Sequence, residues 1–255
     1  MSRVLLLLLV INLSQVSRNY ADINKLGIYG GKNVSIETVP YMVSIFIRKT
    51  DGKKYMCGGS IIHKKFVLTA AHCLRNSIDL SLSWGYVATD NLFNKERQVI
   101  KFEKKICHKK YLPQPYFYND ICILKLTKPL KYGPKIGRVT VADEGFELKE
   151  GTLVNVTGWG DTENNDPLES LRQVTIPIVP KDFCPIADRN ICAGTLGHGT
   201  CYGDSGGPLT YYNIQIGIVS HHRVGGKCSE AHGTIFTSVA IYAKWIAMVI
   251  KMNVP

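Results

Sequence analysis

A serine stands among glycines in the segment Gly203–Pro208, which reads GDSGGP. A serine hydroxyl attacks a carbonyl carbon efficiently only when a base takes its proton and N–H donors stabilise the resulting oxyanion. Glycines on both sides allow the sharp backbone turn that aims N–H groups at a carbonyl. The segment therefore predicts nucleophilic chemistry at Ser205, although a simple glycine-rich turn would have the same composition.

Two further segments hold residues that could activate that hydroxyl. His72 follows two alanines in the segment VLTAAHC, a setting in which a histidine can also be an ordinary core residue. Asp120 stands directly before the apolar run 121–126, and a carboxylate at the head of a buried strand is costly to desolvate without a partner. An imidazole N–H is a suitable partner, so the two segments predict a base and the carboxylate that orients it.

Short apolar runs separated by Gly, Pro, Asn and Asp make up most of the 255 residues. They occupy residues 41–47, 66–68, 121–126, 153–156, 174–179 and 214–219. This pattern predicts many short strands, and hence a sandwich or a barrel. Only the end differs: from Val239 onward the apolar side chains recur every three or four residues, which predicts a helix. The Lys-, Gly- and Pro-rich stretch 128–135 is the expected seam.

The order His, Asp, Ser in these local contexts resembles the chymotrypsin/trypsin family of serine peptidases, and an invertebrate-type chymotrypsin- or elastase-like member in particular. The segments CGGS at Cys57–Ser60 and GWG at Gly158–Gly160 add to the resemblance. It implies an all-β fold of two six-stranded antiparallel β-barrels with a C-terminal α-helix outside. The first barrel is expected over about 28–135, the second over about 136–238 and the helix over about 239–252.

The same resemblance implies a role for each matched residue. Ser205 would attack the scissile carbonyl, His72 would take and return the proton, and Asp120 would fix the imidazole tautomer. The N–H groups of Gly203 and Ser205 would form the oxyanion hole. Ser220 would help to position Asp120 and begin the strand that pairs with substrate.

The resemblance also implies synthesis as an inactive precursor. Ile28-Tyr29-Gly30-Gly31 resembles the mature N-terminus of the family, whose free α-amino group pairs with the carboxylate beside the nucleophile, here Asp204. Most relatives have Arg or Lys just before this point, whereas here it is Gly27. Either cleavage after Lys25 followed by removal of a dipeptide, or one cut by an elastase-like activating protease, would release Ile28.

Specificity is expected from the residues that the resemblance places around the substrate pocket. Gly199 would be its floor, where trypsin-like enzymes hold an Asp, so a buried Lys or Arg of the substrate would lack a counter-charge. His222 would be the first wall, and either Thr234 or Gly233 the second. The narrowed pocket predicts small or medium apolar side chains before the scissile bond. The alternative is that a protonated His222 accepts an acidic side chain. His221 stands where the family usually has Trp.

Eight cysteines in a chain with a secretory leader suggest four disulfides. Resemblance pairs Cys57 with Cys73, Cys184 with Cys192, and Cys201 with Cys228. Cys107 and Cys122 remain. The family places their segments on neighbouring strands, so they form either a fourth bridge or two buried free thiols.

The N-terminus reads as a secretory signal peptide over 1–17, with a basic start and an apolar run from Val4 to Ile11. The alternative to a signal peptide is a buried N-terminal strand. A short propeptide would follow the signal peptide over 18–27. The mature chain, over 28–255, is expected to be secreted, monomeric and without a membrane span. Sequons at Asn33 and Asn155 predict a glycoprotein, with Asn33 the better acceptor.

The formal net charge is +11, and lysines concentrate between Lys101 and Lys135. That cluster is either a solvated face or a site for a polyanion; nucleic acid is not expected. No metal motif or cofactor motif is present in the sequence. The competing function is a catalytically silent homologue that binds a partner through the basic face. Retention of all three triad residues favours an active endopeptidase acting on polypeptide substrates.

Overall fold

The computed structural model describes residues 28–50, 52–75, 80–113, 117–161, 170–183, 189–222, 228 and 233–254. The expected signal peptide and propeptide, over 1–17 and 18–27, therefore lie outside the described residues. So does Cys184.

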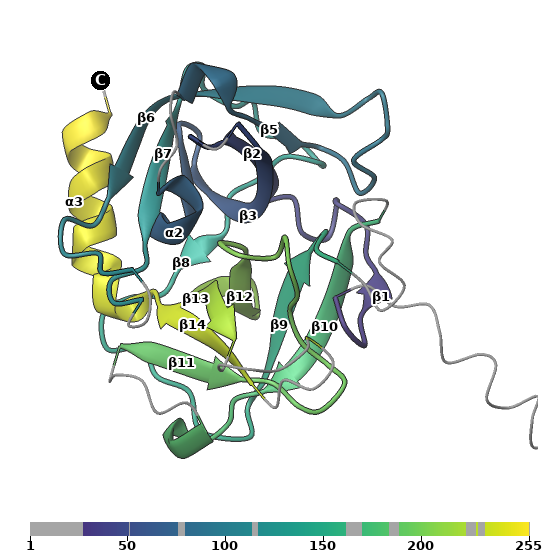
Figure 1. Ribbon diagram of the computed structural model, residues 1–255, viewed down its shortest axis with the longest axis vertical. Coiled ribbons are helices and arrows are strands. Elements are labelled where there is room, and N and C mark those ends of the chain that lie inside the picture. Colours follow the sequence, from purple (N-terminus) through teal and green to yellow (C-terminus); the bar gives the residue numbers. More distant parts are fainter. Residues whose placement is uncertain are drawn as a thin grey trace, which may run out of the picture.

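The first half of the chain closes into a six-stranded antiparallel barrel, at the top of Figure 1. The strands follow the order β2-β3-β4-β7-β6-β5 around it. Their bounds are β2 Met42–Arg48, β3 Lys54–His63, β4 Phe66–Thr69, β5 Trp84–Val87, β6 Gln98–Cys107 and β7 Cys122–Leu126. On β6 the buried Ile100 and Phe102 alternate with the exposed Val99, Lys101 and Glu103, because successive side chains of a strand point to opposite faces.

The second half forms a sheet in the order β1-β10-β9-β12-β13-β14-β11. Its strands are β9 Leu153–Gly158, β10 Arg172–Pro177, β11 Asn190–Ala193, β12 Pro208–Tyr211, β13 Ile214–His222 and β14 Thr234–Ser238. The short β8, Thr140–Val141, pairs with β13 in parallel. The all-β class is confirmed, with one closed six-stranded barrel and a second, eight-stranded sheet that no continuous strand pair closes.

The ends of this second sheet meet through a short contact rather than a full strand pair. Ile178 and Ala193 form an isolated antiparallel bridge next to β10 and β11. Beside it, Val179 N–H donates to the Cys192 carbonyl at 3.0 Å, and Gly194 N–H donates to the Pro177 carbonyl at 3.0 Å. These bonds connect the end of β10 to β11, so β9 to β14 curve towards a barrel without a continuous strand pair that closes it.

The N-terminal segment belongs to the second sheet, not to the first barrel in which the sequence placed it. β1, Lys32–Asn33, pairs antiparallel with β10. Val34 N–H also donates to the Leu171 carbonyl at 2.9 Å. The start of the described chain is thereby held against the half of the molecule that comes last in sequence.

The C-terminal helix α3 spans Ala243–Asn253 and follows a 3-10 turn, η4, over Ala240–Tyr242. It packs beside β6 and β7 of the first barrel (Figure 1), and its buried side chains Ile246 and Val249 join that barrel's core. The helix thus starts a few residues later than expected and ties the end of the chain to its first half. No helix in the described part of the chain is long and apolar enough to cross a bilayer.

Disulfides join three pairs of described cysteines, Cys57–Cys73, Cys107–Cys122 and Cys201–Cys228. Cys107 and Cys122 are directly opposite in the β6–β7 register, which is why a bridge can form there. Cys192 is also disulfide-bonded. None of the described cysteines is free, so the alternative of two buried thiols is wrong for this structure.

Candidate active site

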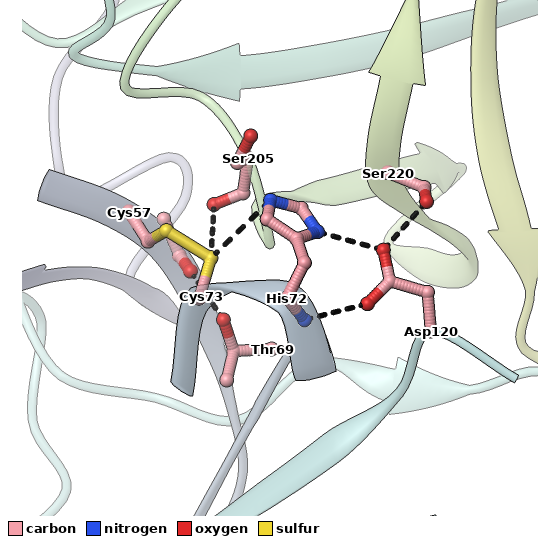
Figure 2. Close-up of a disulfide and its surroundings, with 8 residues drawn as sticks. Cys57, Thr69, His72, Cys73, Asp120, Ser205 and Ser220 are labelled. Carbon is pink, nitrogen blue, oxygen red and sulfur yellow. Dashed lines mark hydrogen bonds and ion pairs between the residues drawn. A yellow bond between two sulfur atoms is a disulfide. The ribbon is translucent and has the colours of Figure 1, made fainter. Parts of the chain in front are cut away.

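The site lies where loops of both barrels meet (Figure 2). His72 stands on α2, Ala71–Leu74, one short turn after β4. Asp120 stands two residues before β7, and Ser220 lies within β13. Ser205 stands in the turn that precedes β12. The structure therefore brings together all three residues predicted for the triad, together with Ser220.

The Asp120 carboxylate is fully buried and accepts three hydrogen bonds. Its Oδ2 accepts from His72 Nδ1 at 2.7 Å and from Ser220 Oγ at 2.6 Å, and its Oδ1 accepts from the His72 backbone N–H at 2.8 Å. Burial alone would raise the pKa of Asp120, but the imidazole of His72 and these donors outweigh it and hold the pKa below its ordinary value. Asp120 is therefore an anion that orients one tautomer of His72.

The turn that carries Ser205 is fastened to both barrels. The Ser205 carbonyl accepts from Gly58 N–H of β3 at 2.7 Å, and Gly206 N–H donates to the Val219 carbonyl of β13 at 2.8 Å. Gly206 has a φ of +82°, and a Cβ there would lie 2.6 Å from the Gly58 carbonyl oxygen. Only glycine fits this close approach, which explains the residue after the serine.

Gly203 and Ser205 are the residues expected to form the oxyanion hole. Gly203 has a φ of +96°, and a Cβ at this position would collide with Met56 Cε at 2.6 Å. Among the described residues, neither the Gly203 N–H nor the Ser205 N–H is used in a hydrogen bond. Both donors are available for an oxyanion.

The Ser205 hydroxyl and His72 are neighbours without a mutual hydrogen bond. Figure 2 shows the imidazole between Ser205 and Asp120, with the Cys57–Cys73 disulfide beside it. His72 Nε2 lies 3.7 Å from Cys73 Sγ. In substrate-free peptidases such catalytic contacts are often long and tighten only when substrate binds.

Asp204 is fully buried beside the predicted activation residue. Its carboxylate accepts from Gly160 N–H at 2.8 Å and from Cys201 N–H at 2.9 Å. Burial nevertheless raises the pKa of Asp204 to about 7. Ile28 is also buried, and both Ile28 Cδ1 and Asp204 Oδ1 border the site of a Cβ at Gly158. No cation among the described residues pairs with this carboxylate, and the Ile28 side chain packs next to it.

The predicted substrate pocket contains more polar side chains than expected. A Cβ at Gly199 would lie 3.6 Å from the Thr234 hydroxyl, and Thr234 is opposite His222 in the β13–β14 register. Gly233 instead packs its Cα against Gly194. Thr234 therefore lies beside Gly199 and opposite His222, which favours it over Gly233 as the expected second wall.

Thr200 connects these walls and was missed by sequence reasoning, although it directly follows Gly199. Its buried hydroxyl lies 3.0 Å from the Thr234 hydroxyl and 3.4 Å from His222 Nε2. Burial lowers the pKa of His222, so its imidazole is neutral at pH 7. Thr200, Thr234 and His222 thus form one cluster of polar side chains beside Gly199.

Two aromatic residues near the triad were also missed. The ring of Phe117 is stacked on His221 at a centroid distance of 4.4 Å and meets His72 edge-on at 6.0 Å. Tyr202 is highly exposed and directly precedes Gly203 of the oxyanion hole. Neither residue stands in a motif, so no signal in the single sequence pointed to them.

Two other features of the described residues lie apart from this chemistry. A cavity of about 360 Å³ opens between η2, Lys181–Phe183, and β11, and shares no lining residue with the triad. Cys57, His72 and Cys73 offer atoms within 4.8 Å of one another, as a metal site would. Both cysteines are disulfide-bonded, however, and have no thiolate to offer.

Known proteins resemble this chain over nearly all of its described length. The family model described as Trypsin matches residues 28–246. Chymotrypsin-2 of Vespa crabro is 36% identical over 228 residues, covering 86% of this chain and 98% of that protein. A human heparin binding protein is 27% identical with a TM-score of 0.78, covering 89% of this chain and 99% of its own. A scabies mite inactivated protease paralogue is also 27% identical with a TM-score of 0.78, covering 88% and 100%.

Proposed function

The chain belongs to the trypsin family of serine peptidases, and from that membership we propose that it is an active serine endopeptidase. The observation that carries the proposal is the buried Asp120 carboxylate, which accepts from His72 Nδ1 at 2.7 Å beside Ser205. A surface histidine or a core histidine would not need a desolvated anion as its partner.

The proposed reaction proceeds through an acyl-enzyme. Ser205 Oγ attacks the scissile carbonyl carbon while His72 Nε2 takes its proton, and the oxyanion is held by the N–H groups of Gly203 and Ser205. His72 then gives the proton to the leaving amine. A water molecule, deprotonated by the same imidazole, releases the acid product and regenerates Ser205. Asp120 stabilises the imidazolium in both halves of the reaction.

The alternative is a silent homologue, and the fold alone does not decide between the two. An inactivated protease paralogue has the same fold as this chain. What favours activity is the chemistry: the three triad residues and Ser220 are present and placed together.

We also propose that the enzyme is made as a zymogen. In the full-length chain the Ile28 nitrogen is an amide and has no charge. Cleavage before Ile28 would create an ammonium near the buried Asp204, whose pKa is raised by burial, and an ion pair would offset the cost of burying that carboxylate. That ion pair would hold the turn between Gly203 and Ser205 in its donor arrangement.

The proposed specificity is for a small or medium uncharged side chain before the scissile bond. The side chains of Thr234 and His222 narrow the pocket from two neighbouring strands, and the Thr200 hydroxyl contacts both of them. A Lys or Arg side chain would find no anion there, which argues against tryptic specificity.

Secretion and glycosylation complete the proposal. Disulfides such as Cys107–Cys122 form and persist in oxidising compartments, in agreement with the expected signal peptide. Asn33 is exposed on β1 and suits a glycan. Asn155 is half-buried on β9, and its Oδ1 accepts from the Thr175 hydroxyl at 2.7 Å, which argues against a glycan there.

The decisive experiment is labelling of Ser205 by a peptidyl organophosphonate with alanine or valine beside the phosphorus. The chain is cleaved to begin at Ile28 and compared with uncleaved chain and with Ser205→Ala. We expect labelling of the cleaved wild-type protein alone, located at Ser205 by peptide mass. A cleaved, folded sample that hydrolyses no peptide and takes no label would establish the silent homologue instead.

A further inference from the structure

A second histidine is hydrogen-bonded into the triad. His221 follows Ser220 on β13, and its Nδ1 lies 3.1 Å from Ser220 Oγ. That hydroxyl donates its one proton to Asp120 Oδ2 at 2.6 Å, so it can meet His221 only as an acceptor. His221 Nδ1 therefore carries the proton. Its Nε2 is buried and has no hydrogen-bond partner among the described residues, so the contact with Ser220 is the hydrogen bond that this ring makes there.

Two imidazoles thus converge on one carboxylate. From one side His221 donates to Ser220, which donates to Asp120; from the other, His72 Nδ1 donates to the same Oδ2 at 2.7 Å. Ser220 and Asp120 are both buried. Hydrogen bonds in a buried chain polarise and strengthen one another, so donation by His221 makes Ser220 a stronger donor to Asp120.

The ring of His221 is held in place independently of this bond. Phe117 stacks on it with an interplanar angle of 19° and presents its edge to His72 at 85°. Any flat aromatic side chain at position 221 could make this stack. The stack therefore does not account for an imidazole, whereas the contact with Ser220 does.

Burial keeps the imidazole of His221 neutral. Burial lowers the pKa of His221 to about 4, with Asp120 opposing this and with His72 and His222 adding to it. These three are the titratable groups that act on the ring from α2, from the segment before β7 and from its own strand. His221 is consequently a neutral donor throughout the pH range in which a serine peptidase works.

We propose that His221 is a positioning residue that acts through Ser220. It keeps the proton of the Ser220 hydroxyl directed at Asp120 and so limits the basicity of that carboxylate. This proposal rests on the proposed function, because it assigns His221 a part in the same site. A less basic Asp120 stabilises the imidazolium of His72 less strongly. Loss of the donor should therefore let the general base become protonated at a higher pH.

The test compares two variants of the cleaved chain. His221→Phe keeps an aromatic ring against Phe117 and removes the donor, whereas His221→Asn loses the ring and keeps an N–H near the place of Nδ1. We expect the acid limb of the kcat/KM profile to move up by about 0.3 pH units in His221→Phe, from the strengthening of coupled hydrogen bonds. His221→Asn should keep the wild-type limb.

Ser220→Ala provides the matched control, because it removes the hydroxyl through which His221 is hydrogen-bonded to Asp120. In that background His221→Phe should cause no further shift. The low-field proton resonance of the His72–Asp120 hydrogen bond, recorded without substrate, should follow the same pattern. His221→Leu is a second variant without the donor, for use if His221→Phe melts below the assay temperature.

The proposal is overturned if the folded donor-lacking variants keep both the wild-type acid limb and the wild-type resonance. It is also overturned if His221→Phe shifts the limb equally in the Ser220→Ala background. The two proposals can fail separately. If the wild-type protein hydrolyses no peptide, but the resonance moves in His221→Phe and not in His221→Asn, the endopeptidase is rejected and the role of His221 is supported.

Discussion

The buried Asp120 carboxylate is stabilised by its hydrogen-bond donors. Because it is an anion and can only accept, it selects the tautomer of His72 that carries a proton on Nδ1. Asp120→Asn retains the shape of the side chain but presents an amide to His72 and selects the wrong tautomer. We expect kcat to fall by about 10⁴-fold, with little loss of thermal stability. Steady-state hydrolysis of a peptide amide by the cleaved variant measures the effect. A fall of less than tenfold would mean that His72 does not depend on Asp120.

Asp204 should make the uncleaved chain sensitive to pH. Folding raises the pKa of this carboxyl from 3.8 to about 7, so the folded state binds more protons than the unfolded state between those values. Its contribution to stability is therefore complete below about pH 4 and is lost as the pH rises towards 7. We expect the melting temperature of the uncleaved wild-type chain to fall over that range relative to Asp204→Asn.

Scanning calorimetry of both uncleaved chains from pH 4 to pH 7 measures this difference. The cleaved chains provide the opposite comparison, because the Ile28 ammonium then needs the carboxylate. There Asp204→Asn should abolish phosphonate labelling. Parallel curves for the two uncleaved chains would show that Asp204 is already paired before cleavage.

His222 should set the size of the pocket, because its imidazole reaches Thr200 from the opposite wall. His222→Gly is expected to raise kcat/KM for leucine or phenylalanine before the scissile bond, relative to alanine, by about tenfold or more. A series of peptide amides ending in Ala, Val, Leu, Phe, Glu or Arg measures the preference. If the wild-type enzyme prefers Glu and this preference disappears above pH 7, a protonated His222 that accepts an acidic side chain is supported instead. A preference for Arg would reject the proposed specificity.

At the scale of elements, the β6–β7 pair carries the loop on which Asp120 and Phe117 lie. The Cys107–Cys122 bridge closes this loop at its base, across a sequence separation of 15. Replacing both cysteines by serine should lower the free energy of unfolding by about 3 kcal/mol, since an open loop gains entropy in the unfolded chain. Urea unfolding of the double variant and of wild type measures it. Equal midpoints would indicate that the strand pairing alone fixes the loop.

The strands also explain what could be predicted from the sequence. The residues Ser205, His72 and Asp120 stand in contiguous motifs, so their types and order were enough to predict the triad. The pocket was harder, because the β13–β14 register shifts between Val219 and His221. A shift of one residue moves each side chain of a strand to the opposite face of the sheet. The sequence alone therefore left open whether Thr234 or Gly233 faces the pocket.

Other features depend on contacts between distant segments. His221 and Phe117 are stacked although more than a hundred positions separate them in the sequence, and neither carries a pattern of its own. The placement of β1 in the second sheet has the same origin: a two-residue strand has no periodicity, and its partner β10 lies far along the chain. Local patterns predicted the elements, whereas tertiary contacts decided these neighbours.

At the scale of the whole molecule, the lysines between Lys101 and Lys135 form no uniform free surface. Lys104 Nζ donates to Asn253 on α3, Lys105 Nζ donates to the Leu74 carbonyl, and Lys125 pairs with Glu103. The exposed lysines outside these contacts include Lys109, Lys128 and Lys131. The polyanion site expected from the sequence would therefore consist of this exposed subset.

Heparin chromatography tests that surface. We expect retention at low salt that weakens steeply as salt rises, because bound counterions are exchanged for lysines. Replacing Lys109, Lys128 and Lys131 together by Gln should advance elution, whereas Lys104→Gln, the matched control of equal charge change per residue, should have a smaller effect. Wild-type protein that flows through heparin at low salt would make the cluster an ordinary solvated face.

The position of β1 has a consequence in time as well as in space. Strands β2 to β7 come from one continuous stretch, so the first barrel can close while the rest of the chain is still being synthesised. β1 is made earlier than any of them, yet it must wait for β10 before it has a partner. A nascent chain halted before β10 should therefore show a protease-resistant first barrel and an N-terminal segment that is still cut readily. A segment that is translated before the first barrel is thus fixed only after that barrel has formed.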